Sequence, residues 1–188
     1  MSSIKKRFIF VFITFIILVI FIIMCIIPEK EYELDALEIN FLSDNQELVV
    51  SNSLPMTDEV GILIDNNNSI DGTTGYVEFE IKSNVEEKVK YELYLTKDTY
   101  DLEVPVKFVK VYLTDENDKE FEYFDKSMVP TFYDLRLAST NAGGKLIYSG
   151  YLKNNGSQKF KLRMWVADTY ELTAEEIKFS ANLNVGIK

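Results

Sequence analysis

Hydrophobic and polar residues alternate with a period of two along most of the chain after residue 36. The clearest run is "GYVEFEIKS", residues 75–83, where Val77, Phe79 and Ile81 share one face and charged residues share the other. This period is typical of a β-strand with one buried face, because successive side chains point to opposite sides of a sheet. The pattern predicts eight or so strands, at 37–42, 47–51, 75–83, 88–96, 106–115, 146–152, 158–166 and 176–187, with a further one at 128–140.

Turn-forming residues separate these runs. The segments "SNVEEK" (83–88) and "KNNGS" (153–157) are predicted to be hairpin loops, the second because both residues of an Asn-Gly pair tolerate positive φ. A change of phase between Phe108 and Val109 indicates a β-bulge. Because strands do not alternate with helices, the pattern predicts an all-β antiparallel sandwich, either immunoglobulin-like or jelly-roll-like.

Residues 8–27 form one apolar run with no charge, glycine or proline. A helix of this length spans about 30 Å, the thickness of a bilayer's hydrocarbon core. Lys5, Lys6 and Arg7 precede the run, so the positive-inside rule places the N-terminus in the cytoplasm. The predicted organisation is a single-pass plasma-membrane protein with a cytoplasmic basic stub at 1–7, a transmembrane signal-anchor helix at 8–27, a juxtamembrane linker at 28–36 and an extracellular β-sandwich at 37–188.

Two other interpretations of the apolar run remain. A cleaved signal peptide usually has an apolar region of about 7–15 residues before an A-x-A-like site. This run is longer, and Leu34 and Asp35 precede Ala36. Lipidation of Cys25 is the other, but Met24 stands where a small residue is expected. An uncleaved anchor is therefore favoured.

Charge and missing residue types narrow the function. Beyond residue 27, 17 Lys and Arg stand against 30 Asp and Glu, a net charge of −13, which repels phosphate backbones and argues against nucleic acid as a partner. The chain has no histidine, and its one cysteine lies in the apolar run. Histidine-based catalytic triads and imidazole zinc sites are excluded. Adjacent acids such as Asp115 and Glu116 point apart on a strand, so the chain is predicted not to be an enzyme.

The segment "LPMTD", residues 54–58, nearly matches the LPxTG signal that sortases cleave. Asp58 replaces the glycine, and the segment does not precede a C-terminal apolar tail. We interpret it as a loop in which Pro55 ends a strand and Thr57 caps a short turn.

A calcium loop is the second candidate motif. The segment "NNSIDGTTGYVE" (67–78) places Asn67, Ser69, Asp71 and Glu78 at positions 1, 3, 5 and 12 of an EF-hand-like loop, a spacing of oxygen ligands that suits Ca²⁺. Position 1 lacks its usual Asp, and Glu78 belongs to a predicted strand. A solvated polar loop is the alternative. No other cofactor is predicted.

The only tryptophan, Trp165, falls on the charged face of its strand. In "QKFKLRMWVAD" (158–168), the alternation directs one set inward and the other outward, the outward set being Lys159, Lys161, Arg163 and Trp165. One hypothesis is that residues 168–176 fold over the indole and accept its N–H. The other is an exposed basic-aromatic patch that binds an acidic partner.

For four tyrosines, too, the sequence leaves open whether the side chain is covered or lies on an exposed binding surface. Each lies on or near the outward phase of its strand, either at a half-buried edge or on a protein-binding surface. They are Tyr76, Tyr94, Tyr112 and Tyr123.

Several segments together resemble a known layout. They are the basic stub and anchor, the loop "VVSNSLPMTDEVG", the pair "YVEFEIKSNVEEKVKYELYL", the segment "YSGYLKNNGSQKFKLRMWV" and an alternating last strand. The chain resembles membrane-anchored surface proteins of Firmicutes and, more distantly, the camelysin/TasA group of secreted β-sandwich proteins, some of which assemble into biofilm matrix fibres. The resemblance carries no catalytic residue to this chain. The uncleaved anchor departs from TasA-type processing.

Two function classes follow. The first is an anchored structural or interaction protein that presents loops or an edge strand to other surface proteins or to copies of itself. The alternative is an extracellular module that binds a glycan or Ca²⁺.

Overall fold

The structure is a computed structural model. In it the chain divides into two compact units, residues 1–33 and 34–188. The structure describes residues 16, 36–43, 48–51, 55–68, 75–100, 102–153, 155–172 and 177–188. Apart from Ile16 and Ala36, the predicted anchor and linker lie outside the described residues. No helix among the described residues has the length and apolar character needed to cross a membrane.

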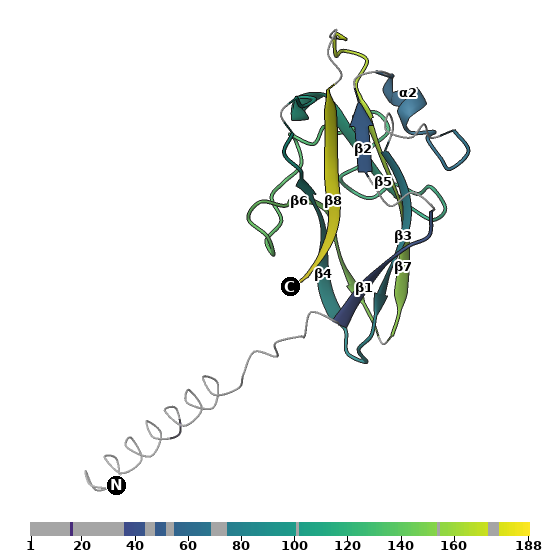
Figure 1. Ribbon diagram of the computed structural model, residues 1–188. Coiled ribbons are helices and arrows are strands. Elements are labelled where there is room, and N and C mark those ends of the chain that lie inside the picture. The colour runs from purple at the N-terminus through teal and green to yellow at the C-terminus, as the bar shows by residue number, and fades with distance from the viewer. Residues whose placement is uncertain are drawn as a thin grey trace, which may run out of the picture. The chain divides into compact units, whose positions relative to one another are not determined.

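The second unit contains two four-stranded antiparallel sheets (Figure 1). Sheet A has the strand order β1 (Leu37–Phe41), β3 (Gly75–Ser83), β7 (Ser157–Val166), β5 (Val109–Asp115). Sheet B has the order β2 (Leu48–Ser51), β8 (Lys178–Ile187), β4 (Val89–Lys97), β6 (Lys145–Leu152). The predicted all-β class with antiparallel sheets is confirmed.

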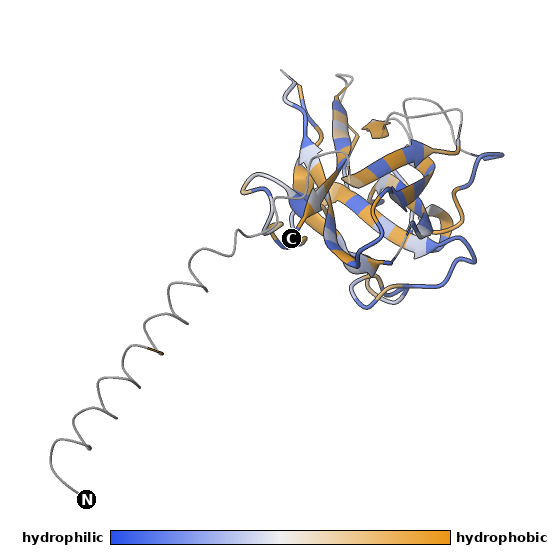
Figure 2. Cartoon of the chain, turned by 90° about the horizontal axis from the view of Figure 1, so that it is seen from below, coloured by the Kyte–Doolittle hydropathy of each residue, from blue (hydrophilic) through white to orange (hydrophobic). Residues whose placement is uncertain are grey.

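The alternating residues form the core between the sheets. Val77, Phe79 and Ile81 of β3 are fully buried, as the period of two predicts. Figure 2 shows hydrophobic and hydrophilic residues alternating along several strands. Phe160 of β7 stacks on Phe79 with ring centroids 5.2 Å apart, and meets Tyr148 of β6 edge-on at 5.1 Å. Aromatic contacts therefore join the two sheets.

Every connection between consecutive strands crosses from one sheet to the other. The odd-numbered strands make up sheet A and the even-numbered strands make up sheet B. The two predicted hairpins are therefore wrong, because 83–88 joins β3 to β4 and 153–157 joins β6 to β7 across the sheets. Asn155 does adopt a positive φ of 55°. Turn chemistry and alternation are the same in a loop that crosses between sheets, so they do not identify the pairing partner.

Two local predictions are also corrected. The phase change before β5 is a 3₁₀ turn, η2 (Val106–Phe108), that follows Pro105, and β5 begins at Val109 without a bulge. Residues 128–140 do not form a regular strand. They make only isolated bridges, Thr131 with Lys110 of β5 and Leu137 with Lys145 of β6 among them, so the segment runs along the edge of β5 and then along that of β6.

Glu92 of β4 holds the loop after residue 138 and the last residue of the chain against sheet B. Its side chain is on the outward phase of the strand but only 2% of the residue is exposed. The carboxylate accepts hydrogen bonds from the backbone N–H of Ser139 (2.8 Å) and Thr140 (3.1 Å), and from Lys188 Nζ (3.0 Å). Burial alone raises the pKa of Glu92, but these donors outweigh it and lower the pKa to about 2.

This lowered pKa predicts a pH-dependent stability. Because the folded pKa lies below the ordinary 4.5, protonation of Glu92 favours the unfolded chain. The stabilisation is complete above about pH 4.5 and is lost as the pH falls toward 2. We expect the loss to be on the order of 3 kcal/mol in the free energy of unfolding. Urea unfolding of wild type and Glu92→Gln across this range measures it. If the free energy of unfolding changed equally steeply with pH in wild type and in Glu92→Gln, the prediction would be contradicted.

Candidate functional site

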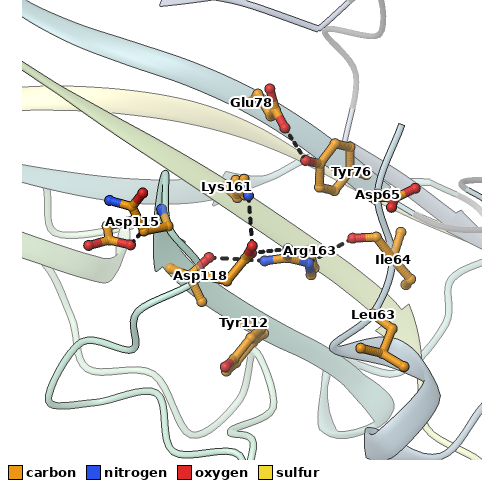
Figure 3. A network of polar contacts seen from close by, with 12 residues as sticks. Leu63, Ile64, Asp65, Tyr76, Glu78, Tyr112, Asp115, Asp118, Lys161 and Arg163 are labelled. Carbon is orange, nitrogen blue, oxygen red and sulfur yellow. Dashed lines mark hydrogen bonds and ion pairs between the residues drawn. The ribbon is translucent and has the colours of Figure 1, made fainter. Parts of the chain in front are cut away.

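The outer face of sheet A contains a polar pocket of about 450 Å³. Three neighbouring strands form its floor, and two chain segments, 62–67 and 118–126, form its walls. The strands contribute Tyr76, Glu78, Tyr112, Lys161 and Arg163. The walls contribute Ile62, Leu63, Asp65, Asn66, Asn67, Asp118 and Lys126. Figure 3 shows the polar contacts at its centre.

Arg163 lies at the centre of the floor and is only 4% exposed. Antiparallel pairing places it between Tyr76 of β3 and Tyr112 of β5, with the guanidinium carbon 5.6 and 5.9 Å from the two ring centroids. Its Nε donates to the carbonyl of Ile64 (2.7 Å), and Nη1 donates to Thr114 Oγ1 (3.0 Å). A buried cation requires such partners, so Arg163 fastens the 62–67 wall to the sheet.

Asp118 is the shared acidic partner of Lys161 and Arg163, two of the three cations of β7. Its carboxylate accepts from Arg163 Nη2 (2.6 Å) and from Lys161 Nζ (2.8 Å) (Figure 3). Burial raises the pKa of Asp118, but the hydrogen bonds from Lys161 and Arg163 outweigh it and lower the pKa overall. Asp118 has a positive φ of 59° in a turn that Asp115 supports by accepting the backbone N–H of Asn117 (2.8 Å). The turn thus presents an anion to both cations.

The two tyrosines on the floor are neutral hydrogen-bond donors. Tyr76 donates to Glu78, and Tyr112 donates to Glu120 Oε1 (3.0 Å). Burial, together with the adjacent carboxylates, raises the pKa of both phenols. The floor therefore combines phenols, a carboxylate and paired cations, which can exchange hydrogen bonds with a polar ligand.

The predicted calcium residues are only partly described. Asn67 and Glu78 line the same pocket, whereas Ser69 and Asp71 lie outside the described residues. The backbone N–H of Asn67 donates to Asp65 Oδ1 (2.7 Å), so the wall makes its own turn. Within the described part of the chain, no three acidic, cysteine or histidine side chains group closely enough to hold a metal ion.

The predicted basic-aromatic patch is not an exposed surface. Arg163 is buried and Trp165 is 0% exposed, which corrects the exposed-patch hypothesis for both. Lys159 pairs with Glu116 (3.8 Å) and Lys161 with Asp118. The four side chains do share one face, as the alternation predicts, but neighbouring segments cover it at Arg163 and Trp165, while Lys159 remains exposed.

Trp165 lies under α2 (Asp58–Gly61), a short helix from the segment that follows β2. A Cβ on Gly61 would lie 2.1 Å from the indole Cε2, so only glycine permits this approach. An ion pair between Asp58 and Lys110 of β5 (3.1 Å) fastens the helix over the ring. The helix α2 was not the predicted cover; of that predicted cover, residues 168–176, the part 173–176 lies outside the described residues, and the indole N–H has no acceptor among the described residues.

The outward tyrosines divide between the two predicted environments. Tyr76 and Tyr112 are each 1% exposed, and Tyr94 is half-buried. Tyr123 is 48% exposed, and the guanidinium of Arg136 lies 4.7 Å from its ring centroid. The row Tyr76–Arg163–Tyr112 was not predicted as a unit, because nothing local pairs β3 with β7 or β7 with β5.

The outer edge of β1 is a second surface feature. The backbone N–H of Leu42 donates to the carbonyl of Glu78 (2.7 Å), and that of Asn84 donates to the carbonyl of Ala36 (2.9 Å). In an antiparallel ladder these contacts assign the even-numbered residues of β1 to the β3 side. Leu37, Ile39 and Phe41 therefore direct their backbone groups outward. In the part of the chain that the structure describes, no strand pairs with this edge.

The fold and the two features define a two-sheet all-β domain with a polar surface pocket and an edge strand, β1, whose outer side pairs with no strand among the described residues. No protein-family model matches the chain, and a search of curated proteins finds no match.

The contact between Gly61 and Trp165 makes a testable prediction. In an exposed helix, Gly→Ala is stabilising by about 0.5–1 kcal/mol. Here the added Cβ meets the indole, so we expect Gly61→Ala to destabilise the domain by about 1–3 kcal/mol and to shift Trp165 emission to longer wavelength as α2 lifts.

Gly143→Ala is the matched control, since a Cβ there is 3.6 Å from Asn141 Oδ1, an ordinary contact. Thermal unfolding and tryptophan fluorescence measure both variants. A Gly61→Ala protein as stable as wild type, with unchanged emission, would show that α2 does not press on the ring.

Proposed function

We propose that this chain is a cell-surface interaction protein. Residues 8–27 anchor it once in the plasma membrane, with residues 1–7 in the cytoplasm and an extracellular β-sandwich of immunoglobulin-like or jelly-roll-like type. The sandwich presents an edge strand to other surface or matrix proteins, including copies of itself. The proposal includes the resemblance of the sequence layout to anchored surface proteins of Firmicutes and, more distantly, to the camelysin/TasA group. The outer edge of β1, with which no strand of the described residues pairs, is the observation that supports the proposal.

An unpaired strand edge is a template for another strand, and folded proteins usually protect it. β1 offers three residues with outward backbone groups and carries only one charge, Glu38. It contains no proline and no lysine, the residues that commonly block such edges. Strand addition there gives affinity through main-chain hydrogen bonds.

The opposite edge of sheet A, formed by β5, is covered by another part of the chain. The backbone of 119–132 bonds along β5, with Val111 N donating to Pro130 O (3.0 Å) and Phe132 N to Val109 O (2.7 Å). The first part of β6 is covered in the same way, since Leu146 N donates to Arg136 O (2.8 Å). The contrast with β5 and with the first part of β6 supports β1 as an edge that is available for a partner.

A pocket of about 340 Å³ lies where the end of β1 approaches sheet B. Phe41, Leu48 and Leu183 give it an apolar part, and Asp98 and Tyr100 line its opening. A strand added to β1 carries side chains past this pocket, so one apolar side chain can enter it. Main-chain pairing would then be combined with a side-chain preference.

The proposal predicts that removing one outward N–H weakens association. Ile39→Pro removes that donor but leaves the hydrogen bonds between β1 and β3, and proline is tolerated on an edge strand when its missing N–H faces outward. Ile39→Ala shortens the side chain and keeps the N–H, so it is the matched control. Sedimentation of residues 34–188, and cross-linking of the full chain on cells through a photoreactive group at position 38, measure association.

We expect Ile39→Pro to lose both self-association and cross-linked partners while Ile39→Ala keeps them. Because the domain is acidic, self-association should also strengthen as salt screens repulsion between copies. Identical association of the two variants, or a protein that remains monomeric and unlinked under all conditions, would reject the edge-strand function.

The pocket on sheet A favours a second candidate function, an extracellular ligand-binding module. Its volume of about 450 Å³ is within the range of small-molecule sites, roughly 300–1,000 Å³. Strand-borne and loop-borne polar groups converge in it. The same chain can combine a ligand site on the face of sheet A with partner binding at its edge.

A further inference from the structure

We propose that the pocket on sheet A binds a neutral saccharide of one or two sugar rings. The inference rests on the second candidate function and names its ligand. The charge of the pocket, its hydrogen-bonding groups and its apolar wall each contribute to the assignment.

The formal charges in the pocket cancel. Asp65, Glu78 and Asp118 stand against Lys126, Lys161 and Arg163. Asp118 already pairs with Lys161 and Arg163, and Lys126 lies 3.9 Å from Glu120. An anionic ligand would have to displace Asp118 and approach Glu78, while a cationic ligand would approach Arg163. A neutral ligand neither has to displace Asp118 nor is repelled by Glu78 or Arg163.

The exposed polar groups are both donors and acceptors. Asn66 and Asn67 are exposed amides, each with an acceptor oxygen and two N–H donors. Glu78 and Asp65 are half-buried carboxylates, and although each already accepts hydrogen bonds within the protein, each keeps further acceptor capacity for a ligand hydroxyl. Neighbouring hydroxyl groups of a sugar ring are also both donors and acceptors, so they match planar amides and carboxylates of this kind.

One wall of the pocket is apolar. Leu63 is 68% exposed and, with Ile62, lies beside the amides. Sugar rings have C–H faces that can cover such a side chain. The rings of Tyr76 and Tyr112 flank Arg163 and are buried, so no aromatic ring of the floor is open for stacking. Without stacking, the affinity rests on hydrogen bonds and Leu63, and we expect millimolar dissociation constants.

The wall is held in shape before any ligand arrives. Asp65 N donates to Asn68 Oδ1 (2.7 Å), and Asn68 Nδ2 donates to the carbonyl of Leu63 (3.0 Å). Arg163 fastens Ile64 from below. A preformed wall reduces the ordering cost of binding.

Saturation-transfer NMR of the full chain, in a detergent without a sugar headgroup, tests the proposal. The probes are N,N′-diacetylchitobiose, cellobiose and maltose, each added at millimolar concentration. Emission of Trp165, the only tryptophan, is the second readout, because Arg163 lies two residues away on the same strand face. We expect at least one probe to bind and to change the emission.

Asn67→Ala and Glu78→Ala should each weaken that binding about tenfold, the effect of losing one hydrogen bond to a ligand, more for the charged group. Glu80→Ala is the control, because Glu80 is the next outward residue of β3 and lines a different pocket with Lys159. It should bind as wild type does. Thermal unfolding of each variant verifies that the domain is folded.

Three results would overturn the proposal. Saccharide binding that survives both Asn67→Ala and Glu78→Ala places the site elsewhere. If no saccharide binds but CaCl₂ changes the Trp165 emission and Glu78→Ala abolishes the change, the ligand-binding function stands and its ligand is a cation. If neither saccharide nor CaCl₂ has an effect, both the ligand class and the ligand-binding function are rejected, while the edge-strand function is judged by its own experiment.

Discussion

The buried guanidinium of Arg163 is the interaction on which the outer face of sheet A depends. A cation at 4% exposure is costly unless its donors are used, and its partners come from two other parts of the chain: Ile64 in one, and Thr114 and Asp118 in the other. Satisfying the charge therefore fixes one wall and one turn onto β7. The pocket exists because these two segments are held apart on either side of the same side chain, with Tyr76 and Tyr112 closing the floor.

Much of the strand content is predictable from alternation, but the pairing of strands is not. The run at 75–83 is β3 as predicted, and its inward residues are fully buried. The hairpins fail because consecutive strands always lie in different sheets, so each strand pairs with a partner at least two strands away in sequence. Such contacts depend on the whole chain's packing and leave no local signal. The turn at Asn155 has the conformation that its residue type favours, and it serves a different connection.

The pocket, like the strand pairing, depends on contacts between distant segments that the sequence alone does not reveal. The calcium spacing brought Asn67 and Glu78 together, and both line the pocket, although the loop's chemistry is hydrogen bonding among its own residues. Alternation places Trp165 on the outward face, but its cover, α2, lies about 100 residues upstream. Gly61 and Arg163 are recognisable only in three dimensions. In the sequence Gly61 is one of eight glycines and Arg163 one residue of an alternating run, and their importance comes from what packs on them.

The edge of β1 and the pocket meet at a single residue, Glu78. Its carbonyl accepts from the backbone N–H of Leu42 at the end of β1 (2.7 Å), and its own N–H donates to Ser43 Oγ (3.2 Å). Its carboxylate faces the pocket and accepts from Tyr76 (Figure 3). A strand that pairs with β1 restrains this end of the edge, and a ligand in the pocket restrains the side chain of the same residue. Any coupling between two such binding events would be reciprocal, so each occupant would change the affinity for the other by the same factor, and Glu78 is the residue whose backbone and side chain contact both features.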